Sequence, residues 1–247
     1  MKNHLERGRP DPYLLTGGPV GCLVIHGFTG SPAEMHPIAK HLHGQGHTVH
    51  APLLAGHGTC PEDMERTGWR DWVASAEAGY RLLAGMTRTV YVIGLSMGGL
   101  LALYIAATRP VQGVVSMCAP IYVKKRAVLL APLLQHFSRF TAKSAPSERF
   151  RDDLWSYDRT PTACVPHLLA LIRRVGRELP SITAPALVVQ GERDNTVDPK
   201  SAGFILKHLG SREKKLVMLR NSGHLVTLDQ DLPDLLSVID TFVAATS

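Results

Sequence analysis

One serine, Ser96, lies between a short apolar run and a helix-forming run, with glycines on both sides of it. The stretch reads TVYVIGLSMGGLLALYIAATRP over residues 89–110, and its centre, GLSMG, fits the pattern G-x-S-x-G. Glycines at the flanking positions permit a turn from a buried strand into a helix that is too sharp for side chains. Such a turn would hold the Ser96 hydroxyl exposed at its tip, where it could act as a nucleophile.

A serine hydroxyl becomes a good nucleophile only beside a base, and that base needs an acid to fix its orientation. After a G-x-S-x-G turn, the acid and then the histidine follow along the chain. Asp194 comes just after the apolar run 185–192, and His224 follows the run 214–220 and the turn sequence NSG. We therefore expect Ser96, Asp194 and His224 to act together. The other acids lie too near a strand end, at the start of the next helix or beyond the histidine: Glu192, Asp198, Asp229 and Asp231.

Attack by a serine on a carbonyl also requires N–H donors for the oxyanion that forms. Met97 directly follows the serine, so its N–H would lie at the start of the helix. The sequence HGFTGSP, residues 26–32, follows the first apolar run, and Gly27 there permits a tight turn. The backbone N–H groups of Phe28 and Met97 are therefore the expected oxyanion donors.

Apolar runs alternate with helix-like segments through most of the chain. The expected strands are 19–27, 47–54, 89–95, 113–120, 185–192 and 214–220, and the expected helices are 32–44, 68–85, 97–109, 199–209 and 232–245. Continuously apolar strands joined by helices are typical of a mostly parallel sheet flanked by helices. Because parallel strands end at one edge, this sheet would bring the three candidate residues together.

The alternation is interrupted over residues 121–180, where helix-like pieces occur without an expected strand. This segment contains eleven lysines and arginines against five acidic residues, which accounts for the whole net charge of +6. We predict that 1–120 and 181–247 form one core domain and that 121–180, the predicted cap, is inserted over the active site. Its charge suits an ordinary solvated surface or a transient contact with a membrane or lipid surface.

Composition limits the other function classes. The chain of 247 residues is 45% hydrophobic and 19% charged, with no apolar run long enough to cross a membrane and no secretory-signal pattern at its start. Four cysteines form no C-x-x-C pair, which favours reduced thiols in the cytoplasm. The basic residues lack the interleaved aromatic residues of a nucleic-acid module.

The histidines give no metal pattern. His41, His43, His47 and His50 run from a helix end into a strand, so no single face collects them. We expect neither a metal nor a cofactor. His57, in the turn AGHGT, receives no chemical role from the sequence.

Several stretches together resemble one family. The segments HGFTGSP, AGHGTCPEDMERTGWRDWVASAEAGY, GLSMGG, YDRTPTA and LRNSGHLVTLD are similar to those of small bacterial monoacylglycerol lipases and related carboxylesterases of the α/β-hydrolase superfamily, over about residues 19–243. The resemblance implies an α/β-hydrolase fold with a small mobile helical cap. It implies Ser96, Asp194 and His224 as the triad, Phe28 and Met97 as the oxyanion hole, and hydrolysis of short- to medium-chain esters without a cofactor.

One position departs from that family. Its monoacylglycerol lipases carry an acidic cap residue that hydrogen-bonds glycerol, and alignment on YDRTPTA puts Leu154 there, with Asp153 next to it. A carboxylesterase without glycerol recognition is therefore an alternative, and the same triad could serve acyl transfer or amide hydrolysis. A non-catalytic binding protein is disfavoured because every triad member and turn glycine is present. The expected partner is a small ester, and the oligomeric state is left open.

Overall fold

The computed structural model describes residues 8–124, 138–143, 150 and 154–246. Its centre is a seven-stranded sheet in the order β1-β3-β2-β4-β5-β8-β9. The strands are β1 Tyr13–Leu15, β2 Val20–Ile25, β3 Thr48–Ala51, β4 Thr89–Leu95, β5 Gly113–Met117, β8 Ala186–Gly191 and β9 Lys214–Leu219. All six runs expected to form strands therefore do so, and the expected mostly parallel sheet is confirmed.

The sheet is parallel from β3 to β9, and only β1 runs antiparallel, against β3. The register aligns the carboxyl ends of the central strands, since Ile25 pairs with Gly94, and Leu95 pairs with Met117. Strand β1 was not expected from the sequence. It has three residues at the sheet edge, which is too short for a periodic pattern.

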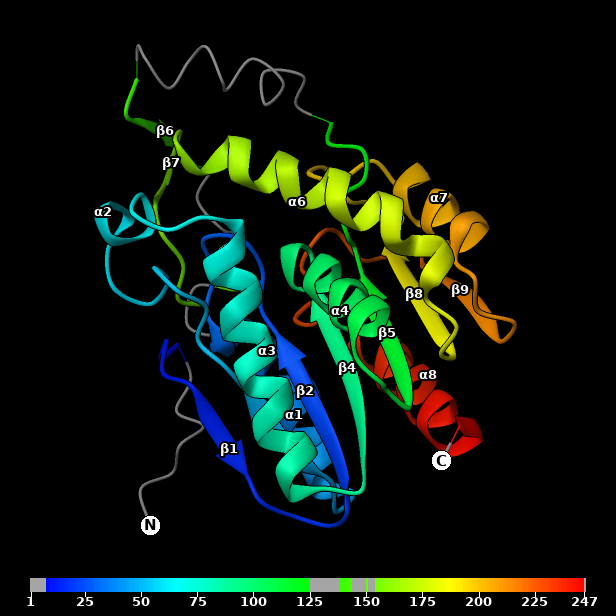
Figure 1. Ribbon diagram of the computed structural model, residues 1–247. Coiled ribbons are helices and arrows are strands. Elements are labelled where there is room, and N and C mark those ends of the chain that lie inside the picture. The colour runs from blue at the N-terminus through cyan, green and yellow to red at the C-terminus, as the bar shows by residue number, and fades with distance from the viewer. Residues whose placement is uncertain (1–7, 125–137, 144–149, 151–153, 247) are drawn as a thin grey trace.

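Helices cover both faces of the sheet (Figure 1). They are α1 His36–Gly44, α2 Pro61–Met64, α3 Trp69–Met86, α4 Met97–Thr108, α6 Cys164–Glu178, α7 Lys200–His208 and α8 Leu232–Thr246, with 3-10 turns at Pro32–Met35 and Leu179–Ser181. Buried side chains of α3, α4, α6 and α7 share one apolar cluster, while α1 and α8 pack into the other. Helix α4 is apolar along most of its length because it lies between the sheet, α3 and α6.

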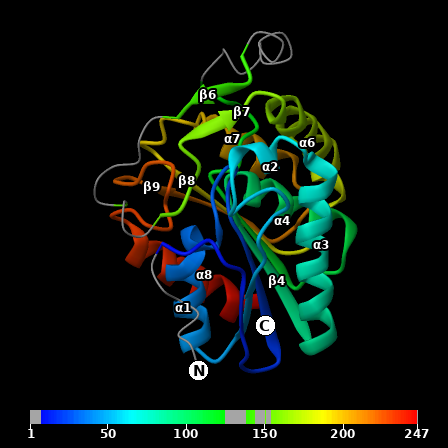
Figure 2. The ribbon, with the colours of Figure 1, turned by 90° about the vertical axis from the view of Figure 1, so that its left-hand side faces the viewer.

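The predicted cap contains two strands that the sequence analysis missed. β6, Phe140–Ala142, pairs antiparallel with β7, Arg159–Pro161. The expectation that this segment lacks strands is therefore wrong: three residues per strand, sixteen residues apart, leave no alternation to detect. Figures 1 and 2 place this pair and α6 beyond the carboxyl ends of the central strands. Residues 125–137, part of the helix-like sequence within 121–180, lie outside the described residues, and the division into core and cap stays a prediction.

Within the described part of the chain, no helix combines the length and the apolar character needed to span a membrane. All four cysteines lie in this part and are free. Cys22, Cys118 and Cys164 are buried, and Cys60 is partly exposed.

Candidate active site

Ser96 occupies a strained turn between β4 and α4. Its φ of 55° and ψ of −119° lie in a region that costs a non-glycine residue about 1–3 kcal/mol. The close packing around it needs glycines, because a Cβ at Gly94 would lie 2.0 Å from Gly98 O, and one at Gly98 would lie 2.1 Å from Ile25 O. The Ser96 N–H also donates to Met117 O at 2.8 Å. Strand, helix and neighbouring strand therefore enforce this turn together.

The serine begins a continuous chain of hydrogen bonds. Ser96 Oγ lies 3.0 Å from His224 Nε2, and His224 Nδ1 lies 2.8 Å from Asp194 Oδ2. A carboxylate can only accept, so Nδ1 carries the proton and Nε2 is free to accept the serine hydrogen. The structure thus brings together the three residues expected from their positions after β4, β8 and β9.

Asp194 is fully buried and has a partner at both carboxylate oxygens. Oδ1 accepts the Thr196 and Val197 N–H groups at 2.8 and 2.9 Å, and Oδ2 accepts Gln190 Nε2 at 3.0 Å as well as His224. Burial acts to raise the pKa of Asp194, but these hydrogen bonds and the charge on His224 outweigh it and lower the pKa below the ordinary value of 3.8. The carboxylate is therefore ionised at neutral pH.

Two acids that the sequence analysis set aside hold the loop of His224. Asp229 Oδ2 accepts the Gly223 N–H at 2.8 Å, and Asp231 Oδ2 accepts the Ser222 hydroxyl at 2.9 Å. Each bond fixes a residue just before the histidine. Both acids follow the NSG turn within ten residues, so the sequence placed them near His224. It did not show whether they hold the loop in place or take part in catalysis.

The two expected oxyanion donors lie on segments that meet at the serine. Met97 is the first residue of α4, so helix geometry leaves its N–H without an intrahelical acceptor. A Cβ at Gly27 would lie 3.4 Å from Ser96 Cβ, which places the loop of Phe28 beside the serine. The Phe28 ring packs edge-on against Trp72, with the centroids 5.5 Å apart.

Gly27, next to Phe28, is held at both backbone polar groups by buried side chains that sequence reasoning did not single out. Its N–H donates to Glu34 Oε2 at 2.9 Å, and its carbonyl accepts His26 Nδ1 at 2.9 Å. Burial raises the pKa of Glu34 above 4.5, opposed by the Gly27 N–H and nearby positive charge. Burial also keeps the pKa of His26 well below 6.5, so this imidazole is neutral, and its Nε2 accepts the Leu54 N–H at 3.2 Å.

One group among the described side chains has the spacing of metal ligands. Atoms of Cys118, Asp194 and His224 lie within 4.8 Å of one another. Both ring nitrogens of His224 already serve Ser96 and Asp194, and burial raises the pKa of the Cys118 thiol well above 9.0, which disfavours the thiolate that a metal needs. This donor set fits the hydrogen-bond chain and does not fit a metal.

The position where the family resemblance expects a glycerol-binding acid carries an apolar side chain. Leu154 is partly buried, and its N–H donates to Phe150 O at 3.0 Å. Asp153 lies outside the described residues. The described part of the chain therefore offers no carboxylate at residue 154 for a glycerol hydroxyl.

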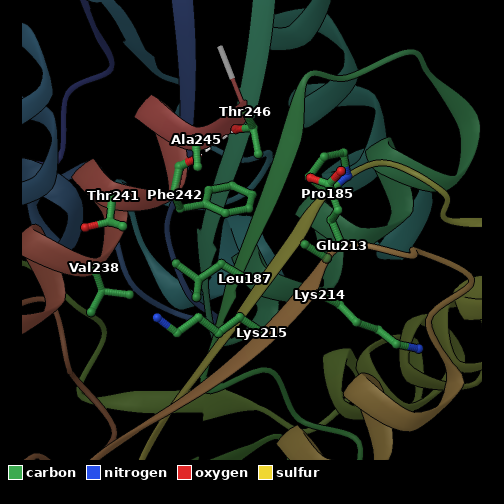
Figure 3. A pocket seen from close by; sticks show the side chains of 11 residues that line it. Pro185, Leu187, Glu213, Lys214, Lys215, Val238, Thr241, Phe242, Ala245 and Thr246 are labelled. Atoms are coloured by element: carbon green, nitrogen blue, oxygen red, sulfur yellow. Dashed lines mark hydrogen bonds between the residues drawn. The ribbon is translucent and has the colours of Figure 1, made fainter.

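An apolar hollow lies at the other end of the molecule, between α8 and the first residues of β8 and β9 (Figure 3). Leu187 and Phe242 line it, together with the stem of Lys215. The strands β8 and β9 begin at this hollow, whereas Ser96, Asp194 and His224 follow the carboxyl ends of their strands. The hollow therefore lies at the opposite edge of the sheet from the candidate site.

A mostly parallel sheet with a strained serine turn after β4, an acid after β8 and a histidine after β9 defines an α/β-hydrolase. The Hydrolase_4 family model, described as "Serine aminopeptidase, S33", matches residues 20–231. The thermostable monoacylglycerol lipase of Bacillus sp. (strain H-257) is 40% identical, with 90% of each chain covered. The carboxylesterase of Bacillus subtilis (strain 168) is 32% identical over 90% of this chain and 91% of its own.

The solved structures agree with these relatives. One that belongs to a study of LipS and LipT, two metagenome-derived lipolytic enzymes, matches with a TM-score of 0.91 and 30% identity, covering 96% of this chain and 98% of the other. The chain therefore belongs to the Hydrolase_4 family of α/β-hydrolases. Within it, the chain is a serine ester hydrolase, the class named by its lipase and carboxylesterase relatives.

Proposed function

We propose that Ser96, His224 and Asp194 are the catalytic triad and that the N–H groups of Phe28 and Met97 form the oxyanion hole. The observation that carries this proposal is the unbroken path from Ser96 Oγ through both nitrogens of His224 to Asp194, at 3.0 and 2.8 Å. The reaction is hydrolysis of short- to medium-chain carboxylic esters through an acyl-enzyme.

Acylation starts at the serine. His224 Nε2 takes the Ser96 proton as Oγ bonds to the ester carbonyl carbon, and the carbonyl electron pair moves onto oxygen. Asp194, ionised and bonded to Nδ1–H, stabilises the imidazolium that forms. When the tetrahedral intermediate collapses, the ester C–O bond breaks and the alcohol leaves with the proton from Nε2.

Deacylation repeats these steps with water. The water gives a proton to His224 as it attacks the acyl carbon, and collapse releases the carboxylic acid while Ser96 regains its proton. In both stages the oxyanion accepts hydrogen bonds from the Phe28 and Met97 N–H groups. Loss of one such donor typically lowers kcat by about 10²–10³.

We propose monoacylglycerols as the substrate class. The support is the 40% identity to an enzyme named monoacylglycerol lipase. The second candidate is a carboxylesterase that does not recognise the alcohol part of its substrate. It is favoured by the apolar Leu154 at the position where a glycerol-binding acid is expected. Acyl transfer and amide hydrolysis are not favoured, because these relatives carry the names of ester hydrolases.

A matched substrate series separates the two candidates. Initial rates are compared for 1-monoacylglycerols and ethyl esters at equal acyl length, from two to sixteen carbons, with Ser96→Ala as the blank. A higher kcat/KM for the glycerol esters at each length supports the lipase. Equal values at each length mean that glycerol is not recognised, and the carboxylesterase assignment replaces it.

We also propose a transient contact between the predicted cap and an anionic lipid surface. Arg139 and Arg159 each form an ion pair with a glutamate of segment 61–65 at 2.8 Å, so their charges are partly neutralised within the protein. Arg173 and Arg177 on α6 are exposed and would make the contact. We expect sedimentation with phosphatidylglycerol vesicles at low salt that is lost in Arg173→Glu/Arg177→Glu. Equal sedimentation with phosphatidylcholine vesicles would contradict an electrostatic contact.

We propose that the enzyme works in the cytoplasm. Four free cysteines support this, because thiols are kept reduced in the cytoplasm, whereas disulfides are common in secreted proteins. Fractionation of the source cells should recover the activity with cytosolic markers. Recovery in the culture medium or an envelope fraction would contradict the assignment.

A further inference from the structure

Thr29, the residue after Phe28, has a backbone conformation that its side chain disfavours. Its φ is 63°, in the left-handed region, although its Cβ is branched. For such a residue this conformation is a genuine outlier that persists only when the surroundings impose it. Thr29 is 1% exposed, so the groups that impose it are protein groups.

Every polar group of Thr29 has a partner. Its N–H donates to His57 Nε2 at 3.1 Å, and its carbonyl accepts the Tyr157 N–H at 3.0 Å. Its hydroxyl donates to Phe28 O at 2.6 Å and accepts Lys143 Nζ at 2.7 Å. Two of these partners, Lys143 and Tyr157, belong to the predicted cap.

His57 is built to accept this N–H. Its Nδ1 donates to Ala55 O at 3.0 Å, which leaves Nε2 as the acceptor. Burial lowers the pKa of His57 to about 4, so the ring is neutral at neutral pH. The ring stacks on Tyr157 with centroids 6.4 Å apart and meets the edge of Trp72 at 6.3 Å.

Tyr157 closes a circuit between three segments. Its hydroxyl donates to Gly56 O at 2.7 Å and accepts a hydrogen bond from the Thr59 N–H at 3.2 Å. These two bonds fix the turn on both sides of His57. Its backbone N–H meanwhile holds Thr29. The circuit runs from Thr29 to His57, along the chain to Gly56, across to Tyr157 and back to Thr29.

We propose that His57 and Tyr157 are positioning residues for the oxyanion hole, acting through Thr29. Phe28 then lies between two held neighbours: Gly27, fixed by the core, and Thr29, fixed partly by the predicted cap. Displacement of the cap segment at Tyr157 would release Thr29 and misplace the Phe28 N–H. This inference rests on the proposed function, because it assumes that Phe28 donates to the oxyanion.

The test uses the full-length enzyme and p-nitrophenyl acetate, whose acyl group is too short to report on the acyl pocket. His57→Phe keeps the stacked ring and removes the acceptor for the Thr29 N–H. We expect kcat per titrated active site to fall about 10- to 100-fold with KM within about twofold, because small displacements of catalytic groups have effects of this size. Binding of a trifluoromethyl ketone, which forms an oxyanion on the serine, should weaken by the same factor as kcat/KM.

Further readouts separate positioning from a merely structural role. His57→Gln, whose carbonyl can accept the same N–H, should recover most of kcat, and the pH profile of kcat/KM should keep its wild-type shape. His43→Phe, on α1 at the far end of the sheet, is the matched control and should keep the wild-type kcat. Tyr157→Phe removes one hydroxyl and carries the test if His57→Phe does not fold.

A kcat within twofold of wild type in the folded His57 variants and in Tyr157→Phe would overturn the inference. A rise in KM alone, with unchanged ketone binding, would overturn it as well. Failure of the proposed function has a different signature, which is activity retained in Ser96→Ala.

Discussion

The Glu34 carboxylate accepts the Gly27 N–H at 2.9 Å, deep in the loop that runs beside Ser96. This acid is 5% exposed, and burial raises its pKa above 4.5. A buried carboxyl thus supports the segment that we propose to bind the oxyanion, and ionisation of that carboxyl reduces the stability of the fold.

Glu34→Gln should change how stability depends on pH. Between 4.5 and the raised pKa, folded Glu34 keeps a proton that the unfolded chain has lost, so the wild-type free energy of unfolding falls as pH rises through this window. Glutamine can still accept the Gly27 N–H but does not ionise. Urea unfolding from pH 4 to 8 should show the variant gaining stability relative to wild type with rising pH. Glu213→Gln, at an exposed carboxyl, should show no such trend, and parallel curves for Glu34→Gln would refute the account.

Asp194→Asn should reduce turnover with little effect on folding. The amide keeps the shape of the carboxylate but cannot hold His224 in the required tautomer or stabilise its charge, so kcat for p-nitrophenyl butyrate should fall about 10³–10⁴-fold. The matched control is Asp240→Asn, because Asp240 also bonds a histidine, His41, at 2.9 Å, but far from Ser96. Equal effects of the two substitutions would argue against a catalytic role.

Gly98→Ala should destabilise the turn of Ser96. The added Cβ would lie 2.1 Å from Ile25 O, a backbone atom of β2 that cannot move aside alone. We expect a loss of about 3 kcal/mol in the free energy of unfolding, measured with urea. Gly203→Ala, in α7 with no atom near the new methyl group, should instead gain about 0.5–1 kcal/mol. Similar values for the two variants would contradict the packing argument.

Much of the fold and site could be predicted from the sequence because both depend on local patterns. Continuous apolar runs indicated the parallel strands, and the glycines around Ser96 indicated the sharp turn. Parallel strands end at one edge, so Asp194 and His224 could be placed near Ser96 without any contact being known.

The remainder depends on long-range contacts that leave no local pattern. His57 and Glu34 resemble ordinary polar residues in the sequence, and their importance arises only where the chain brings them against Thr29 and Gly27. The strands β1, β6 and β7 have three residues each, so pairing partners define them rather than periodicity.

Chelation should leave the activity unchanged. The candidate ligand atoms of Cys118, Asp194 and His224 are close together, but the two nitrogens of His224 are both engaged in hydrogen bonds. We expect the same kcat before and after dialysis against EDTA. A loss that added Zn²⁺ restores would show that this cluster holds a metal.

The central claim, that Ser96 is the nucleophile, is tested most directly by mass spectrometry after labelling with a fluorophosphonate. Trypsin cuts after Arg88 and Lys124 but not between Arg109 and Pro110, so residues 89–124 are released as one peptide. Fragmentation of this peptide distinguishes Ser96 from Ser116, its other serine. The account predicts one adduct, on Ser96, that is absent from Ser96→Ala and forms much more slowly in His224→Ala. Labelling on another residue, or labelling that persists in Ser96→Ala, would contradict it.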